Sequence, residues 1–297
     1  MRSRSAMLIA GLAAGAGLGA IAPLRLEAQE PGRNVLGIDR PGTADVAVDR
    51  GRRYRDTLTM DVYRPRGASK PVPAVVFVHG GLVAGAKGTS PTTWPIYQSW
   101  GRLAAADGLA GVTFNHRLTT NDNVAETEPD VEAAIAHVRA NAKELGIDPE
   151  RLCLAFYSAG GVLAGSALRE PRPFVRCVVL FYPYLDLEHL RMDTRFRRAY
   201  AASRVDSLAP RYSPAAQLGR DPSRLPPIFL AMAGHDEIPG LNASIRRFVA
   251  AAVDQRAPMD LLIHPTGRHG FDEADHDQRT RDILEHCLTF LHRHLGR

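Results

Sequence analysis

Short apolar runs alternate with stretches of helical spacing along most of this chain, and that alternation narrows the possible folds more than any other feature. Residues 73–78 read PAVVFV and residues 110–114 read AGVTF, the continuous apolar pattern of strands buried on both faces. Residues 129–145 carry apolar side chains three and four positions apart and end at Gly146, as a helix does. This repetition predicts an α/β fold, with a mainly parallel, doubly wound sheet covered by helices on both faces.

The remaining elements continue this order to the end of the chain. We expect strands at 54–64, 73–78, 110–114, 152–157, 174–181, 228–232 and 260–263, and helices at 96–106, 129–145, 161–168, 242–253 and 279–294. Residues 183–225 interrupt the alternation with polar, arginine-rich sequence. We predict that they form a short lid insertion over the carboxyl edge of the sheet, where open α/β sheets place their active sites.

The first 28 residues differ from the rest. Arg2 and Arg4 precede an uncharged run at 7–22 that is rich in Ala, Gly and Leu, and a small residue, Ala28, offers a cleavage point. This layout is typical of a secretory signal peptide. We predict a signal peptide over 1–28, one domain over 29–297, a secreted or periplasmic location and no stable membrane association after cleavage. A short membrane anchor is the alternative, although the run is shorter than the ~20 residues that a spanning helix needs.

Charge gives little support to a nucleic-acid partner. The formal net charge is +5, and it falls to +3 when Arg2, Arg4, Arg25 and Glu27 leave with the first 28 residues. No Lys/Arg run is interleaved with aromatic residues, as nucleic-acid binding would favour. Residues 190–224 hold eight arginines against three aspartates. A carboxylate-bearing substrate and a solvated basic surface are both open as explanations.

The cysteines do not indicate a metal or redox site. Cys153 and Cys177 lie in apolar, strand-like runs and Cys287 lies in a helical one, so we predict buried free thiols. No C-x-x-C spacing exists, so neither a redox pair nor a zinc site of cysteines is indicated, and no metal is expected. The sequence favours no oligomeric state.

A serine stands where a strand meets a helix. Residues 152–161 read LCLAFYSAGG, which sets Ser158 on a sharp turn between the two elements. That position exposes the hydroxyl above the sheet, and the free N–H groups of the next helix can stabilise an oxyanion. Ser158 is therefore the candidate nucleophile, although an ordinary serine N-cap has the same local pattern.

Two glycines follow an earlier buried strand, in His79-Gly80-Gly81. Glycines allow the backbone to approach a bound carbonyl and to point N–H groups at it. We predict that Gly80, Gly81 and Ala159 form the oxyanion hole. A glycine turn after a strand is common, and it is the conjunction with Ser158 that favours this role.

His269 is the candidate general base among eleven histidines. It lies on a glycine-flanked loop after the last strand, where an imidazole can reach the serine. Asp236 follows the strand at 228–232 and is the candidate partner that orients the imidazole. The order Ser, Asp, His is the one that α/β-hydrolases use. Asp186, Glu237 and Asp272 compete with Asp236 for this role.

These motifs together resemble the α/β-hydrolase superfamily, near the hormone-sensitive-lipase-like esterases and the dienelactone-hydrolase-type enzymes. The matching segments span roughly residues 50–295: HGG at 79–81, NHRL at 115–118, Asp130-Val131, GIDP at 146–149, SAGG at 158–161, Tyr182-Pro183, LPP at 225–227, Gly234-His235-Asp236 and His269-Gly270-Phe271. The resemblance implies a carboxylesterase-type serine hydrolase that cleaves small-molecule carboxylic esters through an acyl-enzyme, without a cofactor.

Two residues depart from the family pattern. Leu82 stands where the family has a third glycine, and Phe156 stands where it has glycine or another small residue. We expect local repacking to accommodate the Phe156 ring with the serine turn preserved. A peptidase or lactonase on the same triad is one alternative function. A non-catalytic binding protein with a hydrolase fold is the other, and the two departures are its support.

Overall fold

The computed structural model describes residues 35–38, 40–80, 90–118, 123–188, 206–218 and 224–296. Within these ranges eight strands form one sheet in the order β1-β2-β4-β3-β5-β6-β7-β8. They are β1 (Val46–Arg55), β2 (Leu58–Pro65), β3 (Val72–Val78), β4 (Ala110–Phe114), β5 (Ile147–Tyr157), β6 (Val175–Phe181), β7 (Ile228–Ala233) and β8 (Met259–His264). The pairs β1–β2 and β2–β4 are antiparallel, and all other neighbours are parallel. The predicted mainly parallel sheet is confirmed.

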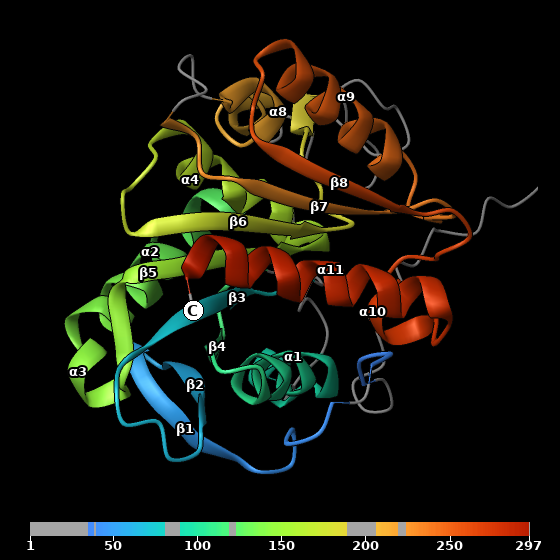
Figure 1. Ribbon diagram of the computed structural model, residues 1–297. Helices are drawn as coiled ribbons and strands as arrows, with labels where there is room; N and C mark the ends of the chain where they lie inside the picture. The colour runs from blue at the N-terminus through green and yellow to red at the C-terminus, as the bar shows by residue number, and fades with distance from the viewer. Residues whose placement is uncertain are drawn as a thin grey trace, which may run out of the picture.

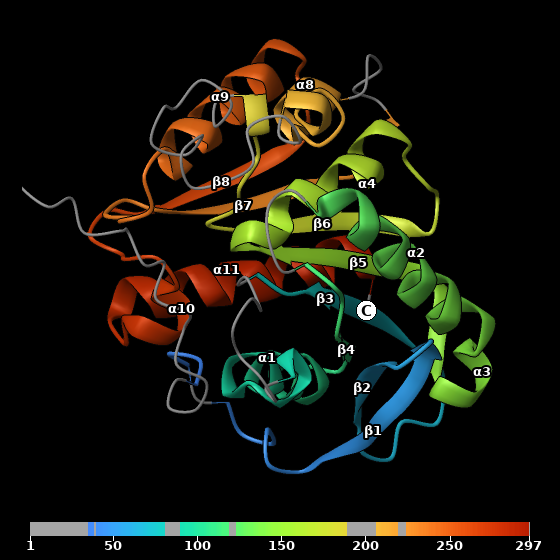
Figure 2. The same ribbon diagram turned by 180° about the vertical axis from the view of Figure 1, so that it is seen from behind.

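Helices cover both faces of this sheet (Figures 1 and 2). The described ones are η1 (Pro91–Thr93), α1 (Pro95–Ala106), α2 (Val124–Ala140), α3 (Ala142–Leu145), η2 (Ser158–Ala164), α4 (Gly165–Arg169), α8 (Pro214–Gln217), α9 (Leu241–Asp254), α10 (Phe271–Ala274) and α11 (Gln278–Leu295). Helices α1 and α11 lie on one face, while α2, α4 and α9 lie on the other. The fold is therefore the doubly wound α/β fold that the alternation predicts.

The core lies in two layers, one on each face of the sheet. Successive side chains of a strand point to opposite faces, so Phe156 joins the cluster under α2, α4 and α9 while Tyr157 joins the cluster under α1 and α11. All three cysteines are buried and free, as predicted. Burial on both faces explains why the central strands are apolar without alternation.

The expected strand at 54–64 is wrong at its beginning. Residues 54 and 55 close β1, and β2 begins only at Leu58. Asp56 makes the turn between them with a positive φ of 44°, a conformation that Asp tolerates better than most residues. Strand β1 is the edge strand and reads VAVDRGRRYR with mostly partial burial, so no apolar alternation reveals it.

Two helices also differ from expectation. Helix α2 begins at Val124, earlier than the expected 129, and contains Pro129. Its first turn buries Val124 and Thr127 completely, so tertiary packing outweighs the helix-breaking tendency of the proline. The helix expected at 161–168 is a 3₁₀ segment, η2, followed by the short α4.

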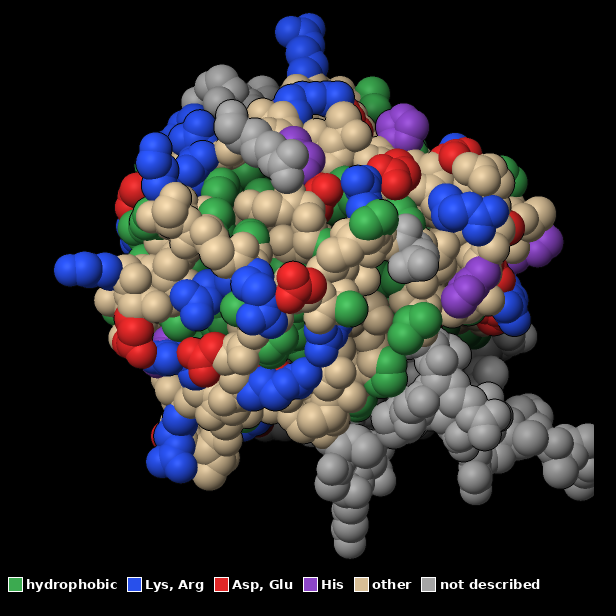
Figure 3. All heavy atoms as spheres, turned by 60° about the horizontal axis from the view of Figure 1, so that its bottom comes forward, with side chains coloured by type: hydrophobic (Ala, Val, Ile, Leu, Met, Phe, Trp, Pro, Cys, Tyr) green, Lys and Arg blue, Asp and Glu red, His purple; other side chains and the backbone are tan. Residues whose placement is uncertain are grey.

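Several predictions fall on residues outside the described ranges. These are the signal peptide over 1–28, Gly81, Leu82 and most of the predicted lid. Of the lid's arginines, the structure describes Arg211 and Arg224, and Arg211 pairs with Glu128 at 3.1 Å. In the described part of the chain, no helix combines the length and apolarity that a membrane span needs. Figure 3 shows one face on which Lys and Arg side chains are interspersed with Asp and Glu.

Candidate active site

Ser158 occupies a strained turn between β5 and η2. Its φ is +48°, in the left-handed region that costs a non-glycine residue of order 1–3 kcal/mol. The surrounding structure holds this backbone in place. The Ser158 carbonyl accepts a hydrogen bond from Tyr184 N–H at 2.8 Å. A Cβ on Gly161 would lie 2.6 Å from the Tyr184 carbonyl oxygen, so glycine is required there.

Phe156 does not distort this turn. Its side chain points away from α1 and α11, into the core cluster under α2, α4 and α9, and is 0% exposed. The bulky ring therefore occupies the core rather than the space beside the serine. The repacking that the sequence analysis expected, with the turn preserved, is what the structure has.

The end of β3 lies directly against the serine turn. A Cβ on Gly80 would lie 2.5 Å from the Tyr157 carbonyl oxygen and 2.6 Å from Ser158 Cβ. A Cβ on Gly160 would lie 2.6 Å from the His79 carbonyl oxygen. No real Cβ tolerates such distances, so glycine on both sides is what lets the two segments approach.

The Gly80 N–H does not point at a free oxyanion site. It donates to Tyr97 Oη at 2.8 Å, and both groups are buried. In this arrangement the only N–H of Gly80 already has an acceptor, and the donor role of Gly80 stays a prediction. Ala159 is the first residue after Ser158 in η2, where the N–H has no acceptor within the helix. Gly81 lies outside the described residues.

Two loops bring Asp236 and His269 together. Gly234 N–H donates to the His264 carbonyl at 2.8 Å, and His235 N–H donates to the Gly267 carbonyl at 2.9 Å. These bonds join the turn after β7 to the loop after β8. Because both strands end at the same edge of a parallel sheet, residues 33 positions apart come into contact.

The three candidate residues form a continuous hydrogen-bonded chain. Ser158 Oγ lies 2.8 Å from His269 Nε2, and His269 Nδ1 lies 2.7 Å from Asp236 Oδ2. The Asp236 side chain is 0% exposed and that of His269 is 15% exposed. The second carboxylate oxygen, Asp236 Oδ1, accepts from Ile238 N–H at 3.0 Å. The imidazole is thus positioned to accept the serine proton while the carboxylate holds its other nitrogen.

The competing acids have other partners. Asp186 forms an ion pair with Arg247. Glu237 accepts from the backbone N–H of His269 at 3.3 Å. Asp272 is fully buried and accepts from Trp100 Nε1 at 2.9 Å and Tyr182 Oη at 2.6 Å. Among the candidates, the hydrogen bond to the imidazole ring belongs to Asp236.

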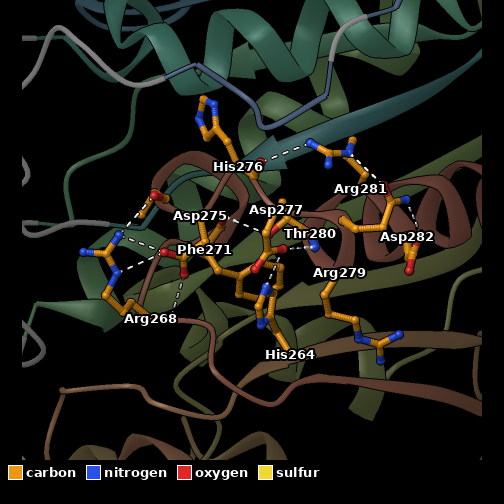
Figure 4. Close-up of polar contacts among 12 residues, drawn as sticks. His264, Arg268, Phe271, Asp275, His276, Asp277, Arg279, Thr280, Arg281 and Asp282 are labelled. Carbon is orange, nitrogen blue, oxygen red and sulfur yellow. Dashed lines mark hydrogen bonds and ion pairs between the residues drawn. The ribbon is translucent and has the colours of Figure 1, made fainter.

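Arg268 and His264, which precede His269 in the chain, form polar contacts with Asp275 and Asp277, which follow it (Figure 4). Arg268 donates through Nη2 to Asp275 Oδ1 at 2.8 Å, and its backbone N–H donates to Oδ2 at 2.9 Å. His264, at the end of β8, lies 3.1 Å from Asp277 Oδ1, which also caps α11 by accepting from Thr280 N–H at 2.8 Å. These contacts join the loop to the residues just before α11 and to the first turn of that helix.

A stacked histidine pair lies beneath the glycine segment. The rings of His79 and His116 are 3.5 Å apart and nearly parallel, at 3°. Both are buried. Burial lowers the pKa of His79 to about 4 and holds the pKa of His116 well below its usual value. Both rings are therefore neutral at neutral pH, which avoids repulsion between stacked charges.

An ion pair of the next residue holds the segment that carries the His116 ring. Arg117, the next residue, donates through Nη2 to Asp130 Oδ1 at 2.7 Å and through Nε to Oδ2 at 2.9 Å. Asp130 lies on α2 and is 0% exposed. The bidentate pair anchors the segment after β4 to the helix, and so positions His116 against His79.

The sequence alone assigns no role to Tyr97 or Tyr182. Tyr97 lies on α1 and accepts the Gly80 N–H. Tyr182 directly follows β6, and its ring lies 4.8 Å from that of His269, edge to face. The Tyr182-Pro183 dipeptide was a sequence signal for the second of these residues, whereas nothing local marks Tyr97. Among the described residues, no group of three or more His, Cys, Asp or Glu is placed to hold a metal ion.

Known families and relatives agree with this fold. The BD-FAE family model matches residues 60–169, a range that includes Ser158. Esterase LipC of Mycobacterium tuberculosis is 26% identical over 240 residues, which cover 73% of this chain and 57% of LipC. Carboxylesterase NlhH of the same species is 27% identical over 235 residues, which cover 72% of this chain and 71% of NlhH. The chain therefore spans little more than half the length of LipC.

A solved structure shares the fold along most of the chain. A truncated carbohydrate esterase from gut microbiota superposes with a TM-score of 0.69 at 18% identity, covering 90% of this chain and 99% of its own. The sheet order, the serine turn and the loops that converge on it define an α/β-hydrolase fold. In sequence the chain is similar to proteins named esterase and carboxylesterase.

Proposed function

We propose that this protein hydrolyses carboxylic esters of small molecules, with Ser158 as the nucleophile. The observation that carries the proposal is the hydrogen-bonded chain from Ser158 Oγ through His269 to Asp236, at 2.8 and 2.7 Å. A serine hydroxyl is a weak nucleophile and needs a base within hydrogen-bond reach. Here the base and the group that orients it are both within that reach, without any rearrangement.

In the proposed reaction Ser158 Oγ attacks the ester carbonyl carbon while His269 Nε2 takes the serine proton. Asp236 holds the imidazole in the required tautomer and stabilises the imidazolium. The tetrahedral intermediate then expels the alcohol, which receives the proton from His269, and the acyl group stays on Ser158. A water molecule that His269 deprotonates attacks this acyl-enzyme and releases the carboxylic acid.

The oxyanion needs at least one backbone donor close to Ser158. The N–H of Ala159 is the described candidate, because it opens η2 and has no acceptor within that helix. Gly81 stays in the proposal as the second donor. Gly80 contributes in another way, since its lack of a Cβ lets the segment lie against Ser158.

Esters are favoured over peptides and lactones because the relatives carry the names esterase and carboxylesterase. The fold alone would not choose among these substrates. Against the non-catalytic alternative stands the position of Phe156. Its ring lies in the core, and Ser158 remains within hydrogen-bond distance of His269.

The test is covalent labelling by a fluorophosphonate, followed by turnover of a panel of esters that vary in acyl length and charge. Wild type should be labelled at Ser158 and should hydrolyse members of the panel. Ser158→Ala should fold, escape labelling and lose at least about a thousandfold in kcat, because no nucleophile remains.

Ser166→Ala is the matched control. Ser166 lies on α4, where its hydroxyl donates to Glu132 at 3.3 Å, and its loss should leave labelling and turnover near wild type. Folded Ser158→Ala protein with wild-type turnover would end the proposal. Labelling without turnover on any ester would favour the peptidase, and absence of both would favour the binding protein.

A further inference from the structure

Tyr182 packs against the side of His269. The two ring centroids are 4.8 Å apart, and the ring planes meet at 63°. In this edge-to-face arrangement an aromatic ring limits the rotation of its neighbour, and such pairs contribute beyond their buried area. The hydrogen bond to Asp236 fixes the position of one imidazole nitrogen. The contact with Tyr182 restricts the tilt of the imidazole ring.

The Tyr182 ring is itself held at its far end. Its hydroxyl donates to Asp272 Oδ1 at 2.6 Å. The other carboxylate oxygen, Asp272 Oδ2, accepts from Trp100 Nε1 on α1 at 2.9 Å. Asp272 is 0% exposed, so water does not compete for either bond. Each oxygen of the carboxylate has a donor, which is the arrangement that a buried carboxylate needs.

The backbone of Tyr182 is as constrained as its side chain. Its φ is +35°, a left-handed conformation that a bulky residue adopts only when the surroundings impose it. Its N–H donates to the Ala231 carbonyl of β7 at 2.8 Å. This backbone directs the ring from the end of β6 across to the loop of His269. Strained conformations of this kind concentrate at functional sites.

We propose that Tyr182 and Asp272 are a positioning pair for His269: the carboxylate fixes the phenol, and the phenol ring fixes the tilt of the imidazole between Ser158 and Asp236. The inference rests on the proposed function, because it assigns the pair to the general base of that reaction. Neither residue exchanges a proton with substrate, so both act through His269.

Burial raises the pKa of Asp272, and the hydrogen bonds that it accepts from Tyr182 and Trp100 oppose that rise. These two bonds therefore stabilise the ionised carboxylate that holds the Tyr182 hydroxyl. The titratable groups that face Asp272 or His269 come from four other elements and loops, with one more beside Asp272: Tyr97, Tyr157, Cys287, Asp236, Glu237 and, beside Asp272, Glu273.

Two nearly isosteric substitutions test the two members of the pair. Tyr182→Phe keeps the ring but removes the hydroxyl that ties it to Asp272. It should lower kcat roughly ten- to hundredfold with little change in KM, because a misplaced base affects the chemical step. Asp272→Asn keeps the shape of the side chain but replaces one of its two acceptor oxygens by a donor, so the Tyr182 hydroxyl and the Trp100 indole no longer both have an acceptor. It should lower kcat over a similar range, again with little change in KM.

Matched controls exist for both changes. Tyr212 also donates its hydroxyl to a carboxylate, Glu128 Oε2, at 2.8 Å, and Asp186 is a buried carboxylate paired with Arg247. Tyr212→Phe and Asp186→Asn should leave kcat and the pH profile near wild type. Glu273→Gln identifies any contribution of that carboxyl, whose pKa burial and Asp272 raise to about 8, to the alkaline limb.

A second readout does not depend on turnover. The low-field proton NMR signal of the His269 Nδ1–H bond to Asp236, identified by its loss in His269→Gln, reports the imidazole position directly. Tyr182→Phe should shift and broaden this signal, whereas Tyr212→Phe should not. Folded Tyr182→Phe and Asp272→Asn proteins with wild-type kcat and NMR signal would overturn the inference. If no ester is hydrolysed, the NMR comparison still decides the inference separately from the proposed function.

Discussion

At the scale of single residues, Asp236 is the one acid among the four candidates that contacts the imidazole ring of His269. Its carboxylate is fully buried, with one oxygen on His269 and the other on the N–H of Ile238. Asp186 is buried as well, but its charge is balanced by Arg247. Their hydrogen-bond and ion-pair partners therefore distinguish Asp236 from Asp186, since both carboxylates are buried and both follow a strand.

Asp236→Asn should cost about a thousand- to ten-thousandfold in kcat, because the amide cannot hold the productive tautomer of His269 or stabilise its positive charge. Steady-state kinetics on the best ester of the panel measure this loss. Asp186→Asn should stay within a few-fold of wild type, and Asp272→Asn should fall between the two. A larger loss in Asp272→Asn than in Asp236→Asn would reverse the assignment of the orienting acid.

At the scale of elements, the junction of β5 with η2 combines two requirements. Its strand half must bury side chains on both faces, and Phe156 and Tyr157 do so on opposite faces. Its turn half must bring Gly160 against the end of β3, where a Cβ would strike the His79 carbonyl. The bulky residue is tolerated because it lies on the strand side of the junction.

Phe156→Ala should lower the free energy of unfolding by about 3–5 kcal/mol through the cavity it leaves, while kcat stays near wild type. Denaturant unfolding and ester kinetics on the same preparation check both parts. Phe248→Ala, in the same cluster and 0% exposed, should show the same loss of stability. A sharp rise in activity in Phe156→Ala alone would mean that the ring restrains the native site.

At the scale of the whole molecule, the stacked histidines link stability to pH. Burial lowers the pKa of both rings in the folded protein, whereas unfolded histidines titrate near 6.5. As pH falls below 6.5, His79 and His116 bind protons in the unfolded chain but stay neutral in the folded protein. Stability from this pair is therefore complete above pH 6.5 and is lost as pH falls toward 4, the folded pKa of His79.

His116→Asn removes one of the two buried histidines. Between pH 7.5 and 5 wild type should lose about 2 kcal/mol more unfolding free energy than the variant, because only wild type has a histidine at position 116 that takes up a proton on unfolding. Glu273, whose raised pKa acts in the opposite direction, contributes equally to both proteins and cancels. His286→Gln, an exposed change on α11, should match wild type. Equal losses in wild type and His116→Asn would contradict a neutral buried His116.

The sequence by itself determined the fold class and the three residues that meet at the site. The runs at 73–78, 152–157 and 228–232 are apolar without polar alternation, which is the pattern of strands buried on both faces. The parallel sheet can therefore be predicted from local sequence. Ser158 and Asp236 follow two of these runs and His269 follows the strand expected at 260–263, and parallel strands bring their carboxyl ends to one edge. The edge strand β1 and the start of α2 could not be predicted so well, because tertiary contacts define them.

Only the tertiary structure decided which contacts surround those residues. Tyr97 takes the N–H of Gly80, and Tyr182 reaches His269 while Asp272 holds its hydroxyl. Tyr97 comes from α1 and Tyr182 from the end of β6, far from their partners in sequence. Local patterns record whether a side chain is buried and in which element, but not the neighbour it meets across the sheet. That choice depends on packing between distant segments, which has no local periodicity to detect.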